Sequence, residues 1–142
     1  MNAQWKRIEA IIGNNESASL EHNVAAFYEH LLQTLTFPCE VTGIEDFQWE
    51  ECYVLGGASP AEYKRLKKTQ PSYCDNYELL TIEKEGFSEW MLFQGDDIGA
   101  IVKRKSDGKE FCLGLSELKG VDKKSANAKL LDDFSMFLMN SR

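Results

Sequence analysis

Alternating apolar positions define one hairpin in the last third of the chain. The segments Ile98–Lys105 and Lys109–Leu115 flank Ser106-Asp107-Gly108, and large apolar residues alternate with smaller ones through the second segment. A period of two is typical of a strand with one buried face. An Asp-Gly pair between two strands favours a type I′ turn, because glycine adopts positive φ without strain. We therefore predict a β-hairpin in the middle of a small antiparallel sheet.

Apolar residues recur at helical spacing in several other segments. Four helices are expected: Asn2–Ile12, a helix from Ser17 or Ser19 as N-cap to the residues before Pro38, Pro60–Lys68, and Ala126–Met139. Ser59 and Glu62 form a capping-box pattern around Pro60, and Ser125 is a good N-cap for the closing helix. Pro38 ends the second helix, because the residue before a proline is disfavoured in the α conformation.

β-branched and aromatic residues dominate further short segments, which favours strands. These segments are Phe37–Ile44, Phe47–Leu55, Tyr77–Glu83 and Ser88–Phe93. Helices at both ends with strands between them indicate the α+β class, with the terminal helices packed on the sheet. We expect a single domain over residues 1–142, since no repeat or low-complexity linker divides the chain.

The negative net charge limits the classes of partner that the protein is expected to bind. The net charge is −7 and the pI about 4.9, so a nucleic-acid phosphate backbone is disfavoured, whereas a cation or a basic protein surface is favoured. No apolar run has the roughly 20 residues of a membrane span. The first residues lack the apolar core of a signal peptide, so we expect a cytoplasmic protein with four reduced cysteines and no membrane contact.

Motifs for catalysis are missing from the sequence. It contains no Cys-x-x-Cys, Gly-x-Gly-x-x-Gly, Walker loop or His-Glu-x-x-His, and His22 and His30 lie eight residues apart. We therefore expect no enzyme. A basic run on the third helix is typical of a solvated face, with an anionic or acidic partner as the alternative: Lys64, Arg65, Lys67 and Lys68.

Clusters of carboxylates remain as candidates for an oxygen-ligand metal site, because calcium takes six to eight oxygen ligands. They are Glu45-Asp46 with Glu50-Glu51, Asp96-Asp97, and Asp122 with Asp132-Asp133. None has the spacing of an EF-hand loop.

The two ends of the chain resemble a family of small acidic bacterial calcium-binding proteins known chiefly from cyanobacteria. The N-terminal block is Arg7-Ile8-Glu9, Phe27-Tyr28, Leu31 and Leu35-Thr36-Phe37-Pro38; the C-terminal block is Gly108-Lys109-Glu110-Phe111, Leu115-Ser116-Glu117-Leu118, Val121-Asp122 and Asp133-Phe134. The resemblance implies a strongly bent antiparallel sheet or SH3-like barrel flanked by helices. It also implies calcium buffering or sensing.

The chain departs from that family at two places. Lys123-Lys124 stands where such proteins carry a dense acidic run, and Ser59–Gln94 looks like an inserted or diverged segment. Two hypotheses follow. The favoured one is a non-enzymatic interaction module that binds a basic partner through the acidic, aromatic segment Glu45–Tyr53. The alternative is a weak calcium-binding protein whose ligands come from Asp122, Asp132 and Asp133, with Glu9 more distant.

Overall fold

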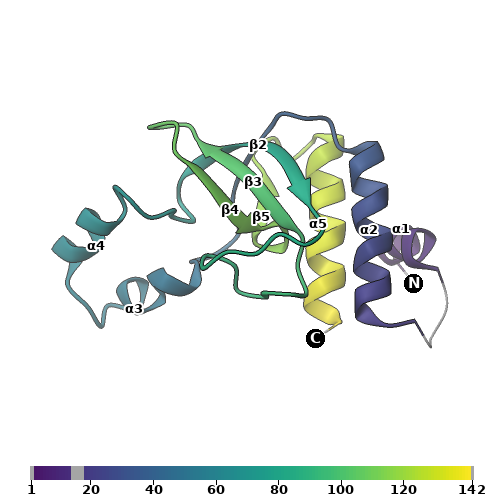
Figure 1. Cartoon of the computed structure of the whole chain (residues 1–142), viewed down its shortest axis with the longest axis horizontal. Coiled ribbons are helices and arrows are strands. Elements are labelled where there is room, and N and C mark those ends of the chain that lie inside the picture. Colours follow the sequence, from purple (N-terminus) through teal and green to yellow (C-terminus); the bar gives the residue numbers. More distant parts are fainter. Residues whose placement is uncertain (1, 14–17, 142) are drawn as a thin grey trace.

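The computed structural model describes residues 2–13 and 18–141 (Figure 1). The helices, in chain order, are α1 (Ala3–Ile12), α2 (Leu20–Thr34), the 3-10 helix η1 (Gln48–Glu50), α3 (Glu51–Val54), α4 (Pro60–Leu66), the 3-10 helix η2 (Leu115–Glu117) and α5 (Ala126–Asn140). The strands are β1 (Cys39–Gly43), β2 (Asn76–Glu83), β3 (Gly99–Arg104), β4 (Glu110–Gly114) and β5 (Leu118–Gly120). Among the described helices, none combines the length and the apolar character that crossing a membrane requires.

The strands form one antiparallel sheet in the order β4-β3-β2-β1-β5. The α+β prediction is confirmed. The SH3-like barrel is not confirmed, because the sheet of the described residues is open, with β4 and β5 as its edges. The hairpin was expected in the middle of the sheet, and this is wrong for its second arm. Of the two arms of the hairpin, only β3 is an inner strand, because it pairs with β2 on one side and with β4 on the other.

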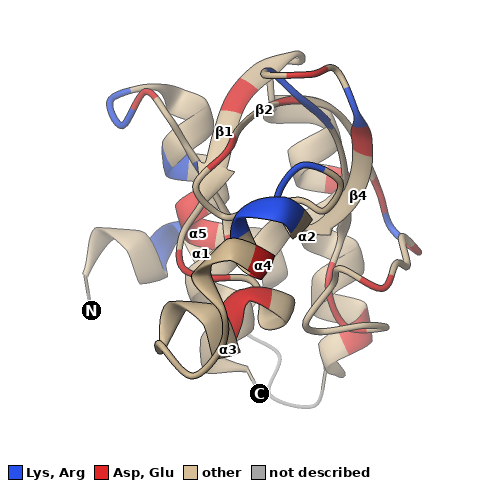
Figure 2. Cartoon of the chain, turned by 90° about the vertical axis from the view of Figure 1, so that its left-hand side faces the viewer, with Lys and Arg blue, Asp and Glu red and all other residues tan. Residues whose placement is uncertain are grey.

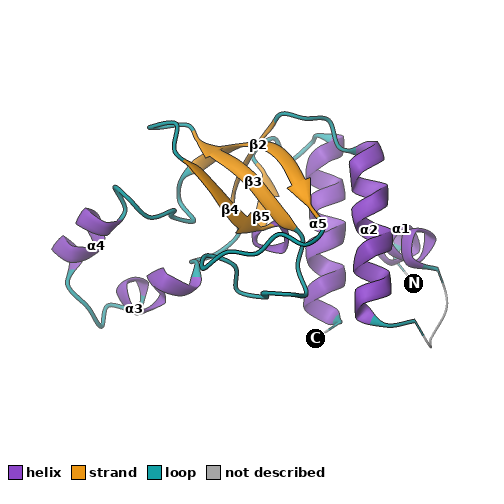
Figure 3. Cartoon of the chain, viewed as in Figure 1, coloured by secondary structure: helices purple, strands orange, loops and turns teal. Residues whose placement is uncertain are grey.

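Helices from both ends of the chain cover the sheet, as the sequence predicts. Figures 1 and 3 show α2 and α5 side by side, with α1 beyond them and the short helices α3 and α4 on the opposite side of the molecule. Phe27 of α2 stacks on Phe137 of α5 at 4.9 Å between ring centroids and meets Phe134 edge-on at 5.4 Å. These rings join the buried faces of the strands in one apolar core.

The helices begin where capping side chains were expected. The Ser19 hydroxyl accepts a hydrogen bond from His22 N, and Ser125 accepts one from Ala128 N. Ser17, the alternative cap of the second helix, lies outside the described residues. Ser59 caps α4 as predicted. The carboxylate of Glu62, expected to complete the capping box, instead accepts a hydrogen bond from the hydroxyl of Tyr53.

The expected strand over Phe47–Leu55 is wrong, because this segment turns into η1 and α3. Glu50, a fully buried carboxylate, holds the segment in this turned conformation. Glu50 Oε2 accepts a hydrogen bond from Phe47 N at 3.1 Å, a local bond that forms only when the chain turns back on itself, and another from Tyr73 N at 3.0 Å. A tertiary partner therefore outweighs the strand propensity of the aromatic residues.

The strand predicted at Ser88–Phe93 is also absent, since the structure has turns there. Ser88 organises them: its hydroxyl accepts from Trp90 N and donates to Cys112 O, while its carbonyl oxygen accepts from Met91 N. Serine side chains compete in this way with the backbone ladder of a strand.

The β3–β4 connection differs from the predicted two-residue turn. It spans the five residues 105–109, and Arg104 N donates a hydrogen bond across it to Lys109 O at 2.7 Å. Gly108 has φ +77°, whereas Asp107 does not adopt a positive φ. Asp107 instead accepts two hydrogen bonds from the Arg104 guanidinium, which lower the pKa of its carboxyl to about 2.

A buried arginine fastens the α3–α4 region to the sheet. Arg104, at the end of β3, is 2% exposed. Besides Asp107, its guanidinium binds Asp75 Oδ2 at 3.1 Å and the carbonyl oxygens of Lys67, Lys68 and Gln70 at 2.9–3.1 Å. Those carbonyls follow the end of α4, where backbone acceptors lack helical donors.

We predict that Arg104→Met lowers the free energy of unfolding by about 3 kcal/mol, because it removes the buried guanidinium that donates to three partly buried carbonyls and to two carboxylates. Arg65→Met, at an exposed position of α4, is the matched control and should change it by less than about 0.5 kcal/mol. Urea denaturation followed by circular dichroism measures both. Equal effects would show that the arginine clamp does not stabilise the fold.

Candidate functional site

The predicted metal ligands on α5 are engaged by α1. Asp133 is 1% exposed, and Arg7 binds both of its oxygens, with Nε to Oδ2 and Nη2 to Oδ1 at 2.9 Å each. Gln4 Nε2 donates to Asp133 Oδ1 at 3.2 Å and to Asp132 Oδ2 at 2.8 Å. The two aspartates thus meet around Gln4 and fasten the first helix to the last.

The other two predicted ligands have separate roles. Asp122 is exposed in the turn before α5, where its Oδ1 accepts from Lys124 N and its carbonyl oxygen from the hydroxyl of Ser125. Glu9 is half-buried on α1. Among residues 2–13 and 18–141, no group of three or more His, Cys, Asp or Glu side chains is arranged to hold a metal. Calcium binding by the predicted set therefore stays a prediction.

A different pair of carboxylates converges beside Gly114. Asp97 directly precedes Ile98 and β3, and Glu117 ends η2. A Cβ added at Gly114 would lie 2.5 Å from Glu117 Oε2 and 2.6 Å from Asp97 Oδ2. Both oxygens thus lie within 2.6 Å of one point, and a side chain at this position would displace them.

Asp97 was among the acidic clusters considered from sequence, whereas Glu117 was missed as a ligand. The available signal was Gly114 itself, a glycine between Leu113 and Leu115 in a strand, which marks a close approach of other groups.

Local hydrogen bonds hold Asp97 in place. Its Oδ1 accepts from Ile98 N at 2.7 Å and from Ser116 N at 3.2 Å, and its Oδ2 accepts from the Ser116 hydroxyl at 2.5 Å. The residue is 3% exposed. Because Ser116 lies next to Glu117 in the chain, these bonds also bring η2, and with it the second carboxylate, close to Asp97.

Glu117 is a carboxylate in an unfavourable place. The pKa of its carboxyl is raised to about 7, chiefly by burial and also by the negative charge of Asp97, while a hydrogen bond from Leu92 N at 3.2 Å acts in the opposite direction. Repulsion between two carboxylates at low dielectric is relieved by a proton or by a bound cation. The pair therefore has the electrostatics of a cation site.

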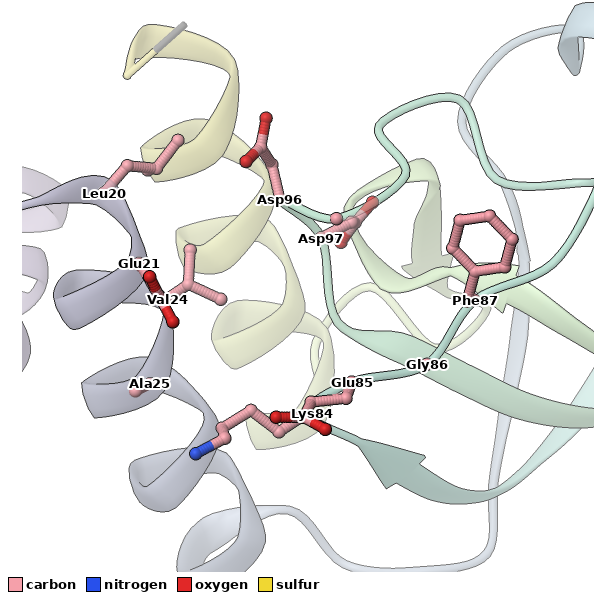
Figure 4. Close-up of a pocket in the computed structure, with 11 residues that line it drawn as sticks. Leu20, Glu21, Val24, Ala25, Lys84, Glu85, Gly86, Phe87, Asp96 and Asp97 are labelled. Atoms are coloured by element: carbon pink, nitrogen blue, oxygen red, sulfur yellow. The ribbon is translucent and has the colours of Figure 1, made fainter.

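Each carboxylate of this pair borders a different surface cavity. Asp97 lines a cavity of about 370 Å³ between α2 and the segments Lys84–Phe87 and Gly95–Asp97. Figure 4 shows the side chains of Asp96 and Asp97 pointing to different sides of their backbone segment. Glu117 lines a second cavity, of about 380 Å³.

The cysteines offer little support for covalent chemistry. All four are free thiols in the structure, and Cys39 and Cys112 are half-buried. Burial raises the pKa of both of these thiols. A thiol with a raised pKa holds little of the nucleophilic thiolate at neutral pH, which disfavours a nucleophilic role for these two residues.

We predict that Glu117 makes stability depend on pH between about 4.5 and 7. The native carboxyl keeps its proton up to about pH 7, whereas the unfolded chain releases it near 4.5, so the native state binds more protons within this window. The contribution is fully present below pH 4.5 and is lost as the pH rises through 7. Its size is on the order of 2 kcal/mol.

The measurement is urea denaturation in chelator at several pH values. Glu117→Gln should remove this part of the pH dependence. The free energy of unfolding of the variant should therefore increase relative to that of the wild type as the pH rises. Glu29→Gln, at an exposed position of α2, is the control and should follow the wild-type curve. A Glu117→Gln curve parallel to that of the wild type would refute the assignment.

Comparisons with known proteins identify a similar fold. No protein-family model matches the chain, and no curated protein matches its sequence. The fold is similar to the crystal structure of Anabaena CcbP, with a TM-score of 0.55 and 16% identity over 98% of this chain and 89% of that one. It is also similar to a calcium binding protein in the calcium-binding form, with a TM-score of 0.57 and 16% identity over 99% of this chain and 97% of that one. The chain therefore has the fold of these calcium-binding proteins.

Proposed function

We propose that this protein binds calcium and that Asp97 and Glu117 supply the carboxylate ligands. The observation that carries the proposal is the approach of Asp97 Oδ2 and Glu117 Oε2 to one point beside Gly114. Asp97 is buried and Glu117 is half-buried, and two carboxylates this close favour occupation by a cation, because water screens their charges only in part.

The donor set suits a weak calcium site. Calcium takes six to eight oxygens from carboxylates, carbonyls and water, and its affinity rises with the number of charged ligands. Asp97 and Glu117 supply two carboxylates, and the hydroxyl of Ser116 donates a hydrogen bond to Asp97 Oδ2. Backbone carbonyls and water would complete the shell, so we expect the modest affinity of a buffer or sensor.

The choice of calcium among cations rests on the fold. One similar structure is a calcium binding protein in the calcium-binding form, aligned over 99% of this chain. All the ligands available at the pair are oxygens, which hard cations such as calcium and magnesium prefer. Calcium tolerates an irregular shell, whereas magnesium demands near-octahedral geometry.

The set predicted from sequence is the second candidate for the ligands. Its most buried member, Asp133, is already neutralised by Arg7 through two hydrogen bonds. A cation there would compete with a guanidinium, which costs affinity. Asp122 and Asp132 are exposed and remain accessible.

We predict that calcium raises the melting temperature of the chelated protein and that magnesium at the same concentration does so less. Calcium at 100 times its Kd stabilises the native state by about 2.7 kcal/mol, a shift of several degrees at this size. Glu117→Gln should abolish the shift. Differential scanning calorimetry measures it, and isothermal titration calorimetry counts the sites.

The matched controls are Asp96→Asn, next to the pair, and Asp122→Asn in the set predicted from sequence; both should keep the calcium response. If Asp122→Asn loses the calcium-induced shift and Glu117→Gln keeps it, the calcium ligands would be Asp122, Asp132 and Asp133 instead. No response in the wild type would remove calcium binding from this protein.

A further inference from the structure

The cavity next to Glu117 is a groove between three parts of the chain. Its walls come from the segment between β1 and α3, from the turn around Leu92 with η2, and from α5. The lining residues are Ile44, Glu45, Asp46, Gln48, Glu51, Leu92, Ser116, Glu117, Ser135 and Met139, around about 380 Å³. We call it the acidic groove.

The charge of the acidic groove has one sign. The described residues that line it include Glu45, Asp46, Glu51 and Glu117 and no lysine or arginine. The cavity beside α2 differs, because Lys84 stands among its acidic residues. Figure 2 shows an acidic position on α3, whereas the neighbouring α4 carries both acidic and basic positions.

Apolar side chains lie exposed in the same groove. Ile44 is 39% exposed, Leu92 46% and Met139 54%. They come from three separate parts of the chain and line one cavity. Methionine adapts its shape to different apolar partners, which suits a binding surface.

The groove is formed in the free protein and fixed by backbone hydrogen bonds. Ile44 N donates to Glu117 O at 2.9 Å, and Leu92 N donates to Glu117 Oε2 at 3.2 Å. The backbone between β1 and α3 forms one wall of the groove. The buried carboxylate of Glu50 fixes it by accepting a hydrogen bond from Phe47 N. A preformed site loses less conformational entropy when it binds.

From these observations we infer that the acidic groove docks a short basic segment of a partner protein, with an apolar side chain of that segment between Ile44, Leu92 and Met139 and its lysine or arginine side chains at the acidic rim. Charge complementarity selects this occupant, because nucleic acids and anionic membranes are repelled by the same carboxylates. The inference goes beyond calcium binding and does not depend on it.

The probe is a fluorescein-labelled synthetic peptide that alternates leucine with lysine and arginine, titrated in chelator and followed by fluorescence anisotropy. The control peptide has glutamate in place of each basic residue. Glu45→Lys combined with Asp46→Lys should weaken binding about tenfold or more, and Leu92→Ser about fivefold. The wild type should not bind the control peptide.

Matched variants test whether the groove itself is responsible. Glu21→Lys with Glu85→Lys makes the same change in net charge at the other cavity, and Phe87→Ser removes a side chain that is 70% exposed. Both should bind the peptide within about twofold of the wild type. Equal weakening by the two charge-reversal variants would mean general attraction to an acidic protein and would overturn the inference.

Two other outcomes would also overturn it. The first is failure of the wild type to bind the basic peptide. The second is self-association in analytical ultracentrifugation that Leu92→Ser removes, because the occupant of the groove would then be a second copy of this chain. Since every titration is made in chelator, a failure of calcium binding leaves these outcomes unchanged.

Discussion

Two buried charged side chains, Arg104 and Glu50, bind backbone groups of the segment between α4 and β2. Arg104 donates to the carbonyl oxygens of Lys67, Lys68 and Gln70, none of which belongs to a helix or strand. Glu50 accepts from Tyr73 N on the same segment and from the hydroxyl of Tyr63 on α4. A backbone group that loses water without gaining a partner is costly, so these two side chains help to hold this segment in place.

Three carboxylates differ in how their charge is compensated: Asp133 and Glu50, which are buried, and Glu117, which is half-buried. Asp133 has a guanidinium across both oxygens. Glu50 has two backbone N–H groups and a tyrosine hydroxyl. Glu117 has one described hydrogen bond, from Leu92 N, and a second carboxylate beside it. The first two arrangements stabilise structure, whereas the third leaves a negative charge that a ligand can neutralise. For this reason the candidate site lies at Glu117.

The candidate cation site and the acidic groove share one short element. η2 carries Ser116, which binds Asp97, and Glu117, which borders the groove. Ser135 of α5 donates its hydroxyl to Ser116 O at 2.7 Å, so the last helix holds η2 against the sheet. A ligand in either place therefore contacts an element that is fixed from both sides, and the rigidity of η2 comes from residues far away in sequence.

Features that depend on neighbours in sequence were predictable. Ser19, Ser59 and Ser125 cap helices because a hydroxyl reaches a backbone N–H three residues on. The antiparallel pairing of β3 and β4 followed from alternation and a loop with glycine. Similarly, the resemblance at the two ends of the chain pointed to the calcium-binding proteins whose fold this chain has.

The tertiary structure alone decided which carboxylates meet. The sequence predicts a cluster of Asp122, Asp132 and Asp133. In the structure Asp133 binds Arg7 instead, and Asp97 lies beside Glu117. Phe47–Leu55 was read as a strand because its propensity is local, whereas the bond from Tyr73 N to Glu50 is not. Burial and charge neighbours arise only when distant segments pack together, so a carboxylate's pKa and its capacity to bind a cation are properties of the fold.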